Sequence, residues 1–160
     1  KDEMEARQKI KNLKKLFQST SRALDRSNIP GIPNAIEKLF EDAHEAIQEC
    51  MNSLEEKPLN MQIVQSSLQK AEKVVTSIHD QVIEMIENVY FIEKIIQYGN
   101  RYRRKYPAVS RRLEVAEEAF RRYDYTSAFE EAAAAVEAAE PGALKKIEDI
   151  INEEYNQDFI

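Results

Sequence analysis

Residues 60–106 read NMQIVQSSLQKAEKVVTSIHDQVIEMIENVYFIEKIIQYGNRYRRKY, and this stretch decides the fold of the 160-residue chain. Apolar or small side chains recur in it at an unbroken spacing of three and four: Met61, Val64, Leu68, Ala71, Val75, Ile78, Val82, Met85, Val89, Ile92, Ile96 and Gly99. A seven-residue repeat sustained this long is typical of a helix that supercoils with partner helices. We therefore predict one continuous helix over 60–106, roughly 70 Å long at about 1.5 Å per residue.

Proline positions divide the rest of the chain into shorter helices. All five prolines stand where a helix is expected to begin or end. Helices are predicted over 2–27 and 34–56 before the long helix, and over 109–122, 126–139 and 142–155 after it. Asn34 with Glu37, and later Asp124, are the expected capping residues. No segment alternates apolar and polar residues as a strand does, so the predicted fold class is all-α.

The long helix is expected to serve two bundles. The first two helices are about half its length, so they can cover only its first half, as an antiparallel three-helix bundle over residues 1–84. A second apolar stripe then begins, at Phe91, Ile95, Tyr98, Tyr102 and Tyr106, and predicts a second helical bundle over residues 85–160. An uncovered part of the seam would suit a homodimer as well as an intramolecular bundle.

Composition excludes several classes of function. The formal net charge of -6 argues against nucleic-acid binding. His44 and His79 lack partners at ligand spacing, and no glycine-rich phosphate loop or nucleophile motif occurs, so we predict no metal site, no cofactor, no catalytic residue and no enzyme. Cys50 lies on an apolar stripe and is expected in the core. No apolar stretch approaches the length of a membrane span, so these residues are expected to be soluble. The start at Lys1, without an initiator methionine, suggests a piece of a longer protein.

Candidate binding residues gather near the end of the long helix. Gln97, Asn100 and Arg101 share one helical face, where two amides and a guanidinium can recognise peptide backbone or carboxylates. An internal polar network would explain the same three residues. Gly99 should mark a close helix contact, made together with Tyr98 and Tyr102. Arg104 belongs to a run of six cations without a carboxylate over residues 101–112, which could be neutralised internally or by an acidic partner or anionic membrane.

Three segments carry a family resemblance. Residues 96–103 read IQYGNRYR, residues 122–125 read RYDY and residues 140–144 read EPGAL. Together they resemble the C-terminal part of EzrA, the bacterial septation ring formation regulator, whose mark is the spaced Gln-x-x-Asn-Arg motif. The specific part of the resemblance covers about residues 92–144, whereas the first two helices match only as general coiled-coil sequence.

The resemblance implies a fold, a partner and a site. It implies spectrin-like helical bundles in a rod on the cytoplasmic side of the bacterial membrane at the division site, anchored by an N-terminal helix absent from this chain. It implies a non-catalytic regulator that restrains assembly of FtsZ, with other division proteins as further partners. Gln97, Asn100 and Arg101 fall on the family's polar patch. The alternatives are a spectrin-type spacer whose patch is only internal packing, and a tetratricopeptide-like peptide-binding module with a groove beside Tyr98 and Tyr102.

Overall fold

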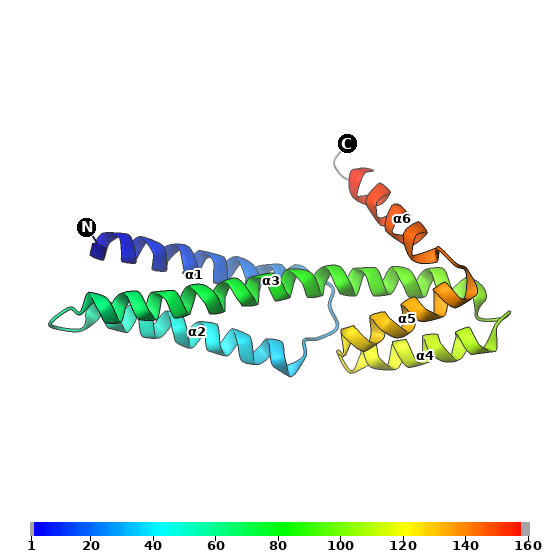
Figure 1. Ribbon diagram of the computed structural model, residues 1–160, viewed down its shortest axis with the longest axis horizontal. Helices are drawn as coiled ribbons and strands as arrows, with labels where there is room; N and C mark the ends of the chain where they lie inside the picture. The colour runs from blue at the N-terminus through cyan, green and yellow to red at the C-terminus, as the bar shows by residue number, and fades with distance from the viewer. Residues whose placement is uncertain (1, 158–160) are drawn as a thin grey trace. The chain divides into compact units, whose positions relative to one another are not determined.

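A computed structural model describes residues 2–157, and every regular element in that range is helical (Figure 1). The predicted all-α fold class is therefore confirmed. The chain forms two compact units, Lys1–Ile86 and Glu87–Ile160, and α3 contributes residues to both. In chain order the elements are α1 (Asp2–Arg26), α2 (Asn34–Glu55), α3 (Met61–Gly99), the short 3-10 helix η1 (Asn100–Tyr102), α4 (Pro107–Arg121), α5 (Tyr125–Ala139) and α6 (Ala143–Gln157).

The first unit is an antiparallel bundle of α1, α2 and the first part of α3 (Figure 1). The heptad positions of α3 form its centre, since Val64, Leu68, Ala71, Val75, Ile78 and Val82 are all buried. Between helices, the rings of Phe17 and Phe40 meet edge to face, with centroids 5.8 Å apart. The fully buried Thr20 hydroxyl lies 3.0 Å from Nδ1 of His79. The repeat in the sequence is thus the core of this bundle.

Capping residues decide where individual helices start. The prediction that Asn34 caps α2 is wrong: Pro33 holds the N-cap position without a side-chain hydrogen bond, and Asn34 is already helical. The predicted cap at Asp124 is confirmed, because its carboxylate accepts a hydrogen bond from the Ser127 N-H at 3.2 Å. Asn60 caps α3 in the same way, accepting from the Gln62 N-H at 3.0 Å.

The long helix ends earlier than predicted. Its α-helical part stops at Gly99 rather than Tyr106, and η1 and a turn follow. Pro107 accounts only for the last residue of the predicted helix: the residue before a proline is driven out of the helical region, and Tyr106 has an extended backbone with φ -129°. Tyr106 is consequently 44% exposed and does not continue the second apolar stripe.

The second unit packs α4, α5 and α6 around the end of α3. Figure 1 shows α4 and α5, antiparallel to each other, beside this part of α3. Ile95, Tyr98, Leu113, Val136 and Ile147 belong to one buried cluster, to which the alanines of α5 contribute. Ile95 and Tyr98 of the second predicted stripe are buried, and so are Ile92 and Gly99 of the predicted seam, whereas Ile96 is only partly buried.

Gly99 lies where side chains of α4 and α5 come close to the backbone of α3. A Cβ atom built at this position would lie 3.0 Å from Cδ1 of Leu113 and 3.1 Å from Cγ1 of Val136. Both neighbours are fully buried, so they have little room to move. A larger residue here therefore has to displace the core of the second unit.

We predict that Gly99→Leu lowers the free energy of unfolding by about 1–3 kcal/mol, because overpacking forces Leu113 and Val136 away from their places. Urea denaturation followed by circular dichroism measures this loss. The control is Gln97→Leu, which puts the same side chain at an exposed position of the same helix and should change stability by less than about 0.5 kcal/mol. Equal stability of Gly99→Leu and the wild-type chain would contradict the packing argument.

Candidate functional site

The end of α3 and the residues that follow it have a polar outer side and a buried inner side. Gln97 in α3, Asn100 and Arg101 in η1, and Arg104 in the next turn are all exposed. Tyr98 and Gly99, which lie between Gln97 and Asn100 in the sequence, are buried, and Tyr102 is partly buried. The four residues predicted to bind a partner, called the polar patch below, thus face solvent while their neighbours hold the helix to the core.

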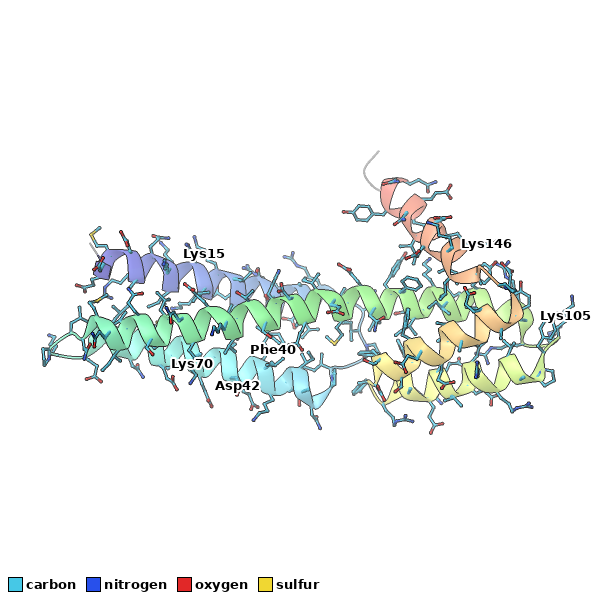
Figure 2. All side chains as sticks on the ribbon, viewed as in Figure 1. Lys15, Phe40, Asp42, Lys70, Lys105 and Lys146 are labelled. Carbon is cyan, nitrogen blue, oxygen red and sulfur yellow. The ribbon has the colours of Figure 1, made fainter. Side chains whose placement is uncertain are left out.

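Glu140 anchors the inner side. It follows α5 directly, and its carboxylate accepts hydrogen bonds from the hydroxyls of Tyr98, at 2.5 Å, and Tyr102. Lys146 of α6 donates a third hydrogen bond to the same carboxylate at 2.9 Å. One acidic side chain therefore joins the end of α3, the α5–α6 turn and the start of α6 (the position of Lys146 is labelled in Figure 2).

This arrangement changes the protonation equilibria of its members. Hydrogen bonds from Tyr102, Tyr98 and Lys146 lower the pKa of Glu140 to about 2, because each donor stabilises the ionised carboxylate. The hydrogen bond to the same carboxylate raises the pKa of Tyr102 to about 12, since ionisation would remove its proton. The group is therefore an ionised carboxylate with neutral tyrosines and a charged lysine over the whole physiological range.

Arg101 is supported by the inner side. Its guanidinium carbon lies 3.8 Å from the centroid of the Tyr98 ring, the distance of a cation–π contact. Within residues 2–157 its N-H groups make no ion pair or hydrogen bond, and the same holds for the side chain of Gln97. Asn100 accepts a hydrogen bond from Nε of Arg103 at 2.8 Å, which leaves its own amide N-H₂ free to donate.

The six cations of residues 101–112 divide into two groups. Arg103 donates to Glu117 at 2.6 Å, and Arg112 lies 3.9 Å from Glu131, so α4 and α5 neutralise these two. Arg101, Arg104, Lys105 and Arg111 are exposed, and across the described part of the chain none of them has a carboxylate within ion-pair distance. Internal neutralisation, one of the expectations from the sequence, is therefore only partial.

Further polar contacts fix α6. Glu137 accepts hydrogen bonds from the N-H groups of Gly142, at 3.0 Å, and Leu144, at 2.8 Å, and so caps the start of α6 from the preceding helix. These two bonds lower the pKa of Glu137. Near the other end of α6, Glu154 accepts from Tyr90 at 2.6 Å and from Lys94 at 3.0 Å. Both ends of α6 are thus tied to other elements of the second unit.

Sequence reasoning missed Glu140, Glu137 and Glu117 as the acids that organise this region. Glu140 entered the prediction only as part of the resemblance. A usable signal was present: tyrosines at positions 98 and 102, four residues apart, present two hydroxyls on one helix face, and an acid stands directly before the Pro-Gly break. In the described residues, no group of three His, Cys, Asp or Glu side chains is placed to hold a metal, and no helix has the length and apolarity needed to cross a bilayer.

Comparison with known proteins identifies the family. The family described as "Septation ring formation regulator, EzrA" matches residues 1–151. The chain belongs to the EzrA family. The resemblance predicted from residues 92–144 is confirmed and extends over the first two helices, whose sequence alone had appeared to be general coiled coil.

Individual relatives support the same assignment. The EzrA of Geobacillus sp. (strain WCH70) is 42% identical over 153 residues, which cover 96% of this chain and 27% of the relative. The EzrA of Bacillus subtilis (strain 168) is 47% identical over 133 residues, or 83% of this chain and 24% of the relative. A solved structure, "Cytoplasmic domain of bacterial cell division protein EzrA", matches with a TM-score of 0.70 and 46% identity over 92% of this chain and 28% of its own. The chain spans about a quarter of the length of these relatives.

We predict that Glu140→Gln is less stable than the wild-type chain at neutral pH but equally stable in acid. The wild-type chain loses the contribution of the ionised Glu140 carboxylate when that carboxylate becomes protonated. The pKa of Glu140 is lowered on folding, so its contribution is complete above the ordinary pKa of 4.5 and disappears as the pH falls toward 2. Thermal unfolding of both chains across this pH range should therefore show a lower Tm for Glu140→Gln at neutral pH and converging Tm values near pH 2. Glu148→Gln, at an exposed position of α6, is the matched control and should follow the wild-type curve. A constant difference at all pH values would contradict the assignment to Glu140 ionisation.

Proposed function

We propose that this chain is part of a non-catalytic regulator of bacterial cell division, which binds FtsZ and restrains assembly of the FtsZ ring through Gln97, Asn100, Arg101 and Arg104. The longer protein would act on the cytoplasmic side of the cell membrane at the division site, held there by a membrane helix outside these 160 residues. The membership of this chain in a family of septation ring formation regulators supports the cell-division role.

The observation that carries the proposal is the exposure of the polar patch. All four side chains face solvent, and within residues 2–157 the side chains of Gln97, Arg101 and Arg104 make no hydrogen bond or ion pair. Long polar side chains that serve only to join helices would be expected to face their neighbours and satisfy each other. Here the neighbouring residues Tyr98, Gly99 and Tyr102 make the contacts to other helices and to Glu140 instead.

The two alternative functions are less well supported by the same geometry. A spectrin-type spacer would keep the polar patch as internal packing, yet the four residues are exposed. A tetratricopeptide-like module would need an open groove beside Tyr98 and Tyr102. The Tyr98 side chain is buried, its ring is covered by Arg101, and both tyrosine hydroxyls are bound by Glu140. This region is therefore occupied by the chain's own side chains.

The proposal predicts that the triple variant Gln97→Ala, Asn100→Ala, Arg101→Ala loses its effect on FtsZ. Sedimentation of FtsZ polymers with the wild-type chain should show co-sedimentation and a smaller polymer pellet. The triple variant should bind at least about tenfold more weakly, because it removes a guanidinium and two amides that donate oriented hydrogen bonds.

A composition-matched control is available on α1. The variant Asn12→Ala, Gln18→Ala, Arg22→Ala removes two amides and one guanidinium from exposed positions and should behave like the wild-type chain. Circular dichroism and urea denaturation check that both triple variants are folded. If the patch variant is folded and still co-sediments and reduces the pellet as the wild-type chain does, the polar patch does not bind FtsZ.

A further inference from the structure

The exposed cations around η1 remain without acids although the chain has a large excess of acids. The whole chain contains 29 acidic and 23 basic residues. Nevertheless, Arg101, Arg104 and Lys105, which lie within five consecutive residues, have no carboxylate within ion-pair distance in residues 2–157. Arg111, the fifth residue of α4, is also exposed and without a carboxylate at ion-pair distance in this part of the chain. Because like charges held close together repel, this cluster favours an anionic partner.

The surroundings of Arg101 favour one kind of anion, a carboxylate. The contact with Tyr98 holds its guanidinium over the ring, and the Tyr98 hydroxyl is itself fixed by Glu140 at 2.5 Å. A guanidinium supported in this way loses less conformational freedom when it binds, and its planar N-H groups match the two oxygens of a carboxylate. The unbonded donors of Gln97 and the Asn100 amide lie in the same segment and add directional hydrogen bonds.

We propose that Arg101, with Arg104, Lys105 and the amides of Gln97 and Asn100, forms a receptor for the carboxylates of an acidic peptide segment. This inference rests on the proposed function, since it names the kind of segment that the polar patch binds. The partner would present aspartate or glutamate side chains in an extended or flexible region, where two or more carboxylates can reach the cations between residues 101 and 105. Arg101 forms the oriented pair, and Arg104 and Lys105 supply attraction over a longer range.

An acidic peptide fits this surface better than an anionic membrane does. Membrane binding by a basic surface is strengthened by apolar side chains that enter the lipid, and the only exposed large apolar side chain among residues 97–107 is Tyr106. Amide donors and a guanidinium held on an aromatic ring are suited to fixed carboxylates, whereas attraction to a lipid surface needs only charge. Figure 2 shows Lys105 at the connection that precedes α4, where its side chain is exposed.

The test measures binding of fluorescent peptides to the 160-residue chain by fluorescence anisotropy. One peptide contains aspartate and glutamate between glycine and serine residues, and its partner has asparagine and glutamine in the same places. We expect the acidic peptide to bind, with an affinity that falls as salt is added, and the amide peptide not to bind. Equal binding of both peptides, or binding of neither, would overturn the inference.

Substitutions then test the role of Arg101. Arg101→Ala should weaken binding of the acidic peptide about tenfold or more, and Arg104→Ala with Lys105→Ala should weaken it and reduce its salt dependence. Arg101→Lys keeps the charge but lacks the planar fork, so it should still bind severalfold more weakly than the wild-type chain. Arg121→Ala, an exposed arginine near the other end of α4, is the control and should bind normally. If Arg101→Lys binds as tightly as the wild-type chain, the oriented pair is wrong.

Two parallel measurements separate this inference from the proposed function. When vesicles of equal parts phosphatidylglycerol and phosphatidylcholine are sedimented, the chain should stay in solution. If the chain instead sediments with the vesicles and does not bind the acidic peptide, the acidic-peptide assignment is overturned. FtsZ co-sedimentation that depends on Arg101, without peptide binding, would keep the proposed function and reject the carboxylate receptor. Peptide binding without an effect on FtsZ would keep the receptor and reject FtsZ as its partner.

Discussion

Glu140 is the acceptor on which the arrangement of the second unit depends. Its ionised carboxylate receives hydrogen bonds from Tyr98 in α3, Tyr102 in η1 and Lys146 in α6. The acid therefore fixes the turn between α5 and α6 and also fixes Tyr98, the ring that supports Arg101. A partly buried contact and the exposed Arg101 are in this way linked through a single side chain, and the low pKa of Glu140 keeps the link intact at physiological pH.

Packing and polarity divide the end of α3 between two tasks. Gly99 allows Leu113 and Val136 to approach closely, and Tyr98 is buried beside it, so the inner side leaves no room for a ligand. The outer side retains donors that have no acceptor in the described residues. The contacts that join this segment to other helices thus lie on its inner side, whereas the outer residues face solvent. This separation explains how a helix end can be both a structural joint and a candidate binding surface.

Much of the fold followed from local pattern. The repeat from Met61 to Gly99 indicated a long helix, and the prolines gave helix limits that agree with the structure within two residues, apart from the end of α3. That end was wrong because Pro107 limits only Tyr106, and the heptad pattern does not show the change from α-helix to 3-10 helix after Gly99. The cap at Asp124 was predicted correctly, whereas Asn34 was not, because Pro33 occupies the capping position. Local rules thus succeeded where one segment decides its own structure.

The sequence by itself determined the helices, the position of the basic run and the family, since these depend on residues near one another or on a motif. Only the tertiary structure decided which cations keep their charge exposed. Arg103 and Arg112 find Glu117 and Glu131, while Arg101 finds an aromatic ring. Tyr98 and Glu140 are 42 residues apart in the chain, so no local pattern specifies that they meet. Packing of helices brings such groups together, and that packing leaves the guanidinium donors of Arg101 without a protein acceptor in the described residues.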